Sequence, residues 1–108
     1  MGPSTRESTH GIPQFDGGQG FQNWSYRVKM FLDSVGVLKT LTENPPEVAG
    51  QREKFDEADR KAKAHIVSFL ANEVLEVVRE KTSAREMWKA LENTFAKKSI
   101  GTQNLLRK

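Results

Sequence analysis

The residues that could carry acid–base or metal chemistry are few and scattered along this chain. There are two histidines, His10 near the N-terminus and His65 in the middle, and no cysteine. Without cysteine, and without two histidines at the spacing of a zinc-binding helix, these residues predict no metal site. The lack of cysteine also excludes disulfides and cysteine nucleophiles. We expect His65 to lie partly buried or exposed on a helix, because it neighbours Ile66 in a helical pattern.

The carboxylates Asp56, Glu57 and Asp59 are close in sequence, but basic residues flank them on both sides. An acid–base pair would need burial to shift its pKa values, so a solvated charged helix face is the favoured interpretation. The glycine-rich run 17–20 precedes a helix whose N-terminus could hold an anion. However, the run has neither the dinucleotide nor the P-loop spacing. We therefore predict that the chain is not an enzyme and uses no cofactor.

Helical periodicity dominates the sequence, and residues 81–99 show it most strongly. Ser83 and Glu86 form a capping box, in which each side chain can satisfy the other residue's free backbone N–H. After Ser83, apolar residues recur at the spacing of one helix face. They are Ala84, Met87, Trp88, Leu91 and Phe95. This segment predicts a helix that buries an indole and a phenyl ring against other helices.

The same periodicity predicts further helices at about residues 21–35, 37–41, 51–71 and 72–81, with another beginning near residue 100. No strand pattern competes, so we predict an all-α fold, a compact bundle of about five to six helices. Ile12–Phe15 should form a short extended arm on these helices, since Pro13 disfavours a helix at the residue before it. The expected core signature is Phe15, Trp24, Phe31, Phe55, Ile66, Met87, Trp88, Leu91 and Phe95.

Two regions follow from composition along the chain. Residues 1–11 are polar and aperiodic, which predicts a disordered tail. Residues 12–108 should form one domain, whose last helix is truncated because the chain stops before that helix could finish. We therefore expect this chain to be part of a longer polypeptide. No apolar run approaches the length that spans a membrane, so no membrane partner is expected.

The charge distribution leaves two interpretations open for the C-terminal end. The chain has 17 basic and 14 acidic residues, a net charge of +3. Its last sixteen residues carry four basic side chains and no acidic one: Lys97, Lys98, Arg107 and Lys108. They suit either a solvated helix end or a patch that contacts phosphates. A DNA-reading helix at 81–99 is disfavoured, because Glu86 and Glu92 on its exposed face would oppose phosphates.

Four motifs occur in a recognisable order. They are Ile12-Pro-x-Phe15-Asp-Gly17; Phe21-x-x-Trp24 with Arg27 and Met30; Asp59-x-x-Ala62-Lys-Ala64-x-Ile66 with Leu70; and Lys81-Thr-Ser-Ala-Arg-Glu-Met-Trp88-Lys-Ala-Leu91 with Phe95 and Lys98-Ser99. From about residue 12 to its end, the chain resembles the capsid N-terminal region of the Gag polypeptide of copia-type LTR retrotransposons. It departs from that family at Phe55, where Trp is frequent, and this chain has no zinc knuckle.

The resemblance implies a retroviral-capsid-like fold and a structural protein that assembles into a shell around element RNA. The implied partners are other copies of the chain, the C-terminal region of Gag, and RNA bound mainly through parts of Gag that this chain lacks. The implied location is a virus-like particle in the cytoplasm. The first helix and the exterior of the helix at 51–71 are the expected assembly faces. Two alternatives remain: a domesticated Gag-derived module whose hydrophobic groove binds peptides or proteins, and a helical nucleic-acid-binding domain.

Overall fold

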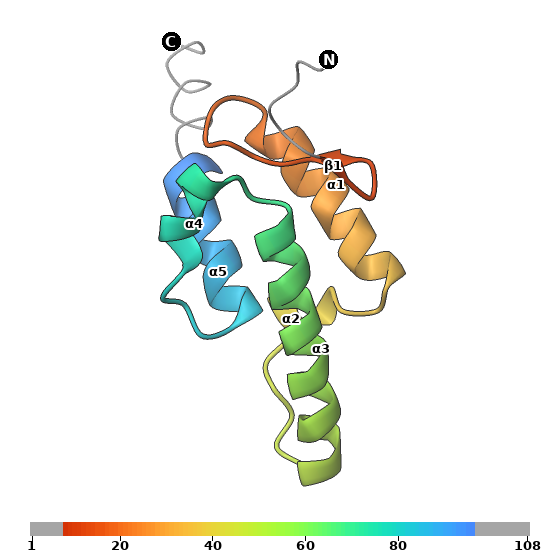
Figure 1. Ribbon diagram of the computed structural model, residues 1–108. Coiled ribbons are helices and arrows are strands. Elements are labelled where there is room, and N and C mark those ends of the chain that lie inside the picture. The colour runs from red at the N-terminus through yellow and green to blue at the C-terminus, as the bar shows by residue number, and fades with distance from the viewer. Residues whose placement is uncertain (1–7, 97–108) are drawn as a thin grey trace, which may run out of the picture.

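The computed structural model describes residues 8–96, and most of this range is helical (Figure 1). This confirms the predicted all-α class. The elements in chain order are the short strands β1 (Ser8–Thr9) and β2 (Ile12–Pro13), then α1 (Phe21–Ser34), α2 (Lys39–Thr42), α3 (Ala49–Ser68), α4 (Asn72–Val78), α5 (Ala84–Leu91) and the π-helical turn η1 (Glu92–Ala96). The helix predicted near residue 100 lies outside the described residues.

A small hairpin stands where the sequence predicts the end of a disordered tail. β1 pairs antiparallel with β2, and His10 and Gly11 turn between them with φ angles of 55° and 77°. Ile12, only 5% exposed, anchors this hairpin in the hydrophobic core. Strands of two residues have no measurable period, so pattern analysis missed them. Residues 1–7 of the predicted tail lie outside the described range.

The arm Ile12–Phe15 also decides where α3 ends. The sequence predicts this helix as far as residue 71, but its last residue is Ser68. Beyond it, the Phe15 N–H donates to the Phe69 carbonyl, and the Ala71 N–H donates to the Phe15 carbonyl, both at 2.9 Å. A backbone group bonded to the arm is not available to continue the helix. The predicted boundary is therefore wrong by a few residues, for a tertiary reason.

The predicted helix at 81–99 is shorter and less regular than its apolar stripe indicates. Ser83 caps α5, because its hydroxyl oxygen accepts the Glu86 N–H at 3.1 Å. The reciprocal bond of the capping box is displaced by one residue: Glu86 accepts the Thr82 N–H, at 3.2 Å, in place of that of Ser83. The chain then changes from α to π geometry at Glu92. Residues 97–99 lie outside the described range.

The core lies where α1, α5 and the end of α3 meet the arm. Trp24 of α1 stacks on Trp88 of α5, with ring centroids 5.5 Å apart and an angle of 14° between the rings. The Trp24 indole N–H donates to the Phe69 carbonyl at 3.2 Å. Phe15 adds its ring 5.3 Å from that of Trp24, and Phe95 of η1 packs edge-on to Phe15 at 4.8 Å. One aromatic cluster therefore joins four segments.

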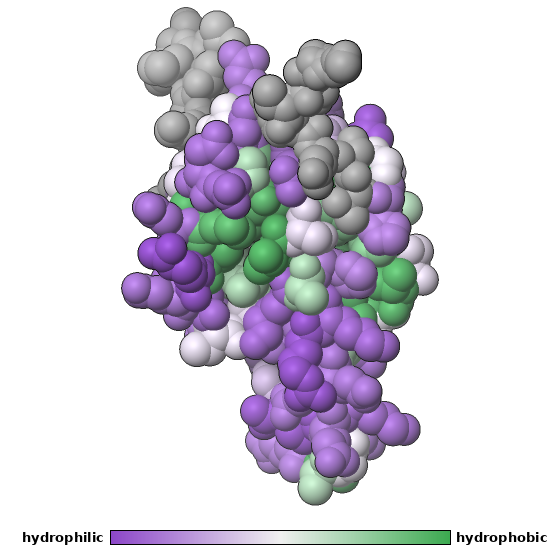
Figure 2. Space-filling model, viewed as in Figure 1, coloured by the Kyte–Doolittle hydropathy of each residue, from purple (hydrophilic) through white to green (hydrophobic). Residues whose placement is uncertain are grey.

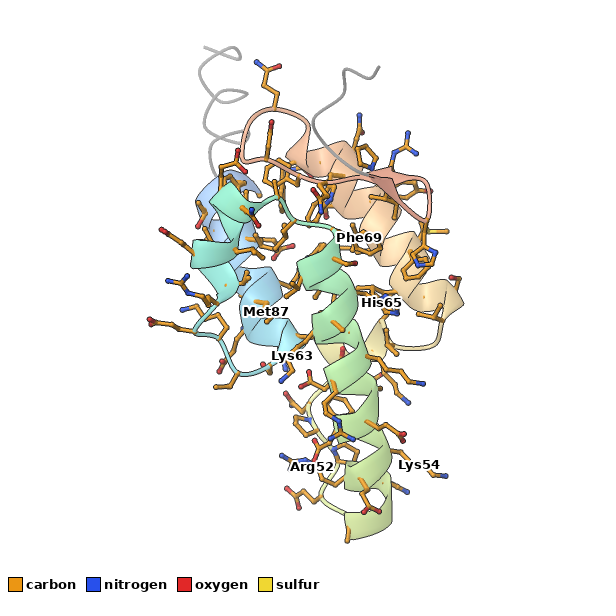
Figure 3. All side chains as sticks on the ribbon, in the orientation of Figure 1. Arg52, Lys54, Lys63, His65, Phe69 and Met87 are labelled. Atoms are coloured by element: carbon orange, nitrogen blue, oxygen red, sulfur yellow. The ribbon has the colours of Figure 1, made fainter. Side chains whose placement is uncertain are left out.

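The first half of α3 projects away from this cluster, as Figure 1 shows. Figure 2 shows mostly hydrophilic residues over the projecting end, with a small hydrophobic patch at its tip, whereas the larger hydrophobic patches lie on the rest of the domain. Figure 3 labels Arg52 and Lys54 in this region, and both are exposed. The projecting half of α3 is thus the charged face that the sequence predicts.

We expect Trp24→Ala and Trp88→Ala each to lower the free energy of unfolding by about 3–5 kcal/mol, the usual cost of emptying a buried aromatic site. Both side chains are almost fully buried. Tyr26→Ala is the matched control, because this ring lies on the same helix as Trp24 but is 66% exposed. Urea melts followed by circular dichroism measure all three. A loss below about 1 kcal/mol at either tryptophan would contradict the assigned core.

Candidate functional site

The nine residues expected in the core are distributed over one main cluster and its surroundings. Phe15, Trp24, Ile66, Met87, Trp88 and Leu91 are buried in that cluster, and Phe31 and Phe95 pack half-buried at its edge. Phe55 is also buried but lies outside the cluster, at a pocket of about 290 Å³ that Thr40 and Pro45 help to line. These side chains hold the helices together and offer no reactive group.

The two histidines, which sequence analysis treated separately, meet at the turn of the hairpin. The His10 ring stacks on Phe31 at 4.5 Å, and the His65 ring packs edge-on to Phe31 at 4.8 Å. The two imidazole centroids are 6.2 Å apart. Figure 3 shows His65 on the side of α3 that faces α1. No sequence pattern predicts this contact, because the hairpin brings in His10 from a distant part of the chain.

This histidine pair is a packing contact. Burial lowers the pKa of His65, and the nearby charges of His10 and Lys61 lower it further. Among residues 8–96, no group of three or more histidine and acidic side chains could hold a metal ion.

The carboxylates at 56–59 do not converge on a shared site. Asp56 pairs with Arg52 one turn away, at 3.1 Å, on an exposed surface. Asp59 points to the start of α5, where it accepts the Ala84 N–H at 2.9 Å and lies 3.9 Å from the Lys63 ammonium. Asp59 is thus a second cap of α5, a role that local spacing does not reveal because its partner is distant in sequence.

The glycine-rich run forms a turn beside a cleft. The Gly18 N–H donates to the Asp16 carboxylate at 3.0 Å, and Gly20 adopts a φ of 90° immediately before α1. A cleft of about 400 Å³ lies between the arm and the start of α1, and Asp16 and Arg27 both line it. Because the Asp16 carboxylate would repel a bound anion, the cleft does not have the chemistry of a phosphate site.

The residues proposed for nucleic-acid contact can be placed only in part. Lys97, Lys98, Arg107 and Lys108 lie outside the described residues, so their role stays a prediction. On α5, Arg85 donates to the Asn44 side-chain oxygen at 2.7 Å. Hydrogen bonds from the Thr82 backbone and hydroxyl lower the pKa of Glu86. These polar groups of α5 are therefore engaged within the domain. Within the described range, no helix is long and apolar enough to cross a membrane.

Comparison with known proteins identifies the family. The sequence model of the family described as gag-polypeptide of LTR copia-type matches residues 28–108. This chain belongs to that family. The resemblance inferred from the four motifs is thereby confirmed, and the chain is a copia-type Gag domain.

A curated relative of this Gag chain is the Retrovirus-related Pol polyprotein from transposon TNT 1-94 of Nicotiana tabacum. The two sequences are 24% identical over 98 residues, which cover 90% of this chain but 7% of the relative. The Gag chain therefore spans a small part of that polyprotein. No solved structure matches the chain.

We expect acid to destabilise the Gag domain through His65. Burial lowers its pKa in the folded state, so the unfolded chain, with a pKa near 6.5, binds the proton more readily. The contribution of neutral His65 to the free energy of unfolding is therefore complete above about pH 6.5. It is lost as the pH falls through the pKa of His65 in the folded state. Urea melts at pH 7.5 and 5.5 measure the loss. His65→Gln should reduce this pH dependence, and an unchanged dependence in the variant would contradict the assignment.

We expect Asp59→Ala to lower the free energy of unfolding by about 1–2 kcal/mol, because it removes a largely buried cap of α5. Asp56→Ala is the matched control on the same helix: its side chain is 48% exposed and pairs only at the surface. It should cost less than about 1 kcal/mol. Equal losses in chemical denaturation would show that the Asp59 cap contributes no more than a surface ion pair.

Proposed function

We propose that this Gag chain is a capsid domain, which assembles with copies of itself into the shell of a virus-like particle around the RNA of a copia-type element. Membership of the copia-type Gag family is the observation that carries the proposal. In this proposal, residues 12–108 belong to the N-terminal capsid domain of a longer Gag. The C-terminal region of Gag would be a further partner, and the particles would form in the cytoplasm.

The partners of the polar side chains and the exposure of the apolar ones support a structural role. The carboxylates Asp56 and Asp59 and the residues Arg85 and Glu86 of α5 all bind other groups of the domain. Large apolar side chains nevertheless remain on the surface, with Tyr26 66% and Met30 53% exposed. A shell built from repeated weak contacts requires such faces and needs no pocket.

The arm counts against the peptide-binding alternative. Ile12 and Phe15 are about 95% buried, and the Phe15 backbone makes two hydrogen bonds to residues 69–71. The groove that could receive a peptide is thus filled by the chain's own arm. A peptide of the same kind would have to displace it and would lose the advantage of an intramolecular partner.

The test is particle formation by the Gag polypeptide that contains this domain. Negative-stain microscopy of the purified polypeptide should show closed particles, and RNA inside them should resist added nuclease. Trp24→Ala in the same polypeptide is the control, because weakening the core should reduce the particle yield. A Gag polypeptide that stays monomeric at high concentration and low salt would contradict the proposal.

A further inference from the structure

The solvent face of α1 combines exposed apolar side chains with positive charge. Tyr26 and Met30 are one helical turn apart and lie at the centre of this face, opposite the buried Trp24 and Val28. Arg27 and Lys29, both exposed, lie on either side of them, and the Lys29 ammonium also lies 5.9 Å from the centroid of the Trp88 ring. Asp33, one turn after Met30, is exposed on the same side, so this side of α1 carries two basic residues and one acidic residue. We call the four residues Tyr26, Arg27, Lys29 and Met30 the α1 face. Its centre resembles an interface core, because exposed large apolar residues are flanked by charges that can select a partner.

The solvent face of α4 and its following turn has the opposite charge. Glu73, Glu76 and Glu80 are exposed, and their spacing places them on one side of the helix, opposite the buried Val74 and Val78. We call these three glutamates the α4 face. The half-buried Leu75 and Val77 border it and add apolar surface. Arg79, which is also exposed, follows Glu76 by three residues. Three glutamates against one arginine leave this side of α4 with a net negative charge, which suits a basic surface.

The two faces lie on opposite sides of the domain. Figure 1 shows α1 and α4 at the two flanks, with the core and α3 between them. Because each helix buries its apolar side toward that core, the α1 face and the α4 face point away from each other. One domain therefore cannot bring its own two faces together, but two copies can.

We propose that the α1 face of one Gag domain binds the α4 face of a second copy. The contact is head-to-tail: Arg27 and Lys29 approach the glutamates of the neighbour, while Tyr26 and Met30 pack against Leu75 and Val77. The pair keeps one free face of each kind, the α4 face of the first copy and the α1 face of the second, so the same contact repeats and closes into a ring where the rotation permits. A symmetric pairing of two α1 faces would offer Arg27 and Lys29 one acidic residue, Asp33, whereas the α4 face offers three glutamates.

This inference rests on the proposed function, since it assigns the contact by which the capsid domains would associate. It also predicts the effect of salt. The charges of both faces are exposed, so their attraction should weaken as the Debye length shortens from about 30 Å at 0.01 M to about 10 Å at 0.1 M ionic strength.

Charge reversal tests the contact. We expect sedimentation velocity to show concentration-dependent association of the chain at low salt, at concentrations up to about 1 mM. Arg27→Glu/Lys29→Glu and, separately, Glu73→Lys/Glu76→Lys should each weaken association at least about tenfold, since like charges then face each other. Mixing the two variants should restore association, because each then offers the complement of the other. Lys54→Glu/Arg60→Glu on α3 is the control for the α1 variant, because it changes the net charge by the same amount and no effect on association is expected.

A second pair of variants removes the apolar centre without changing charge. Tyr26→Ser/Met30→Ser should abolish association, whereas Val48→Ser, at a site 62% exposed before α3, should not. Circular dichroism melts establish that every variant is folded. A chain that stays monomeric at about 1 mM, or a mixture of the two charge variants that does not associate, would overturn the proposed contact.

Different results would contradict the α1–α4 contact and the proposed capsid function. Particles formed by a Gag polypeptide carrying either charge reversal would overturn the α1–α4 contact but leave the capsid proposal intact. Failure of the unaltered polypeptide to form particles would contradict the capsid proposal, whatever the association of the 108-residue chain.

Discussion

The Trp24 side chain is the point on which this fold depends. Its ring stacks on Trp88 of α5, its N–H binds the carbonyl that follows α3, and the arm places Phe15 beside it. Three segments of the chain are therefore held by one residue of α1. A stacked indole pair contributes dispersion and apolar burial, while the hydrogen bond orients the Trp24 ring. The positions of α1 and α5, and so of the outer surfaces they present, follow from this arrangement.

The Phe69 carbonyl has a second role, because it accepts two donors. It binds both the Trp24 indole N–H and the Phe15 backbone N–H, so the arm and α1 meet at the residue that follows α3. This shared acceptor turns an otherwise separate N-terminal segment into part of the core. The arm therefore fills the groove that could otherwise receive a peptide. Large apolar side chains that stay exposed, such as Tyr26 and Met30, lie on the outer side of α1.

Membership of the copia-type Gag family and the arrangement of charge lead to the same view of function. Polar groups that could have formed a reactive site serve as caps and ion pairs inside the domain, as Asp59 does at the start of α5. The exposed surfaces include a basic, partly apolar face on α1 and an acidic one on α4. Their opposite placement gives the domain a direction. A unit with two different faces can repeat head-to-tail, as in the contact proposed above.

The sequence by itself determined the helical class, the approximate position of each helix, the Ser83 cap and the burial of Trp24 and Trp88. These features are local, since a helix face and its first turn are encoded within a few residues. Its motifs also determined the family. The sequence did not reveal the hairpin at 8–13, the end of α3 at Ser68, the contact of His10 with His65, or the capping of α5 by Asp59. Only the tertiary structure decided these, because each depends on a partner distant in sequence, and a bond to such a partner outweighs the weak local preference that sequence patterns report.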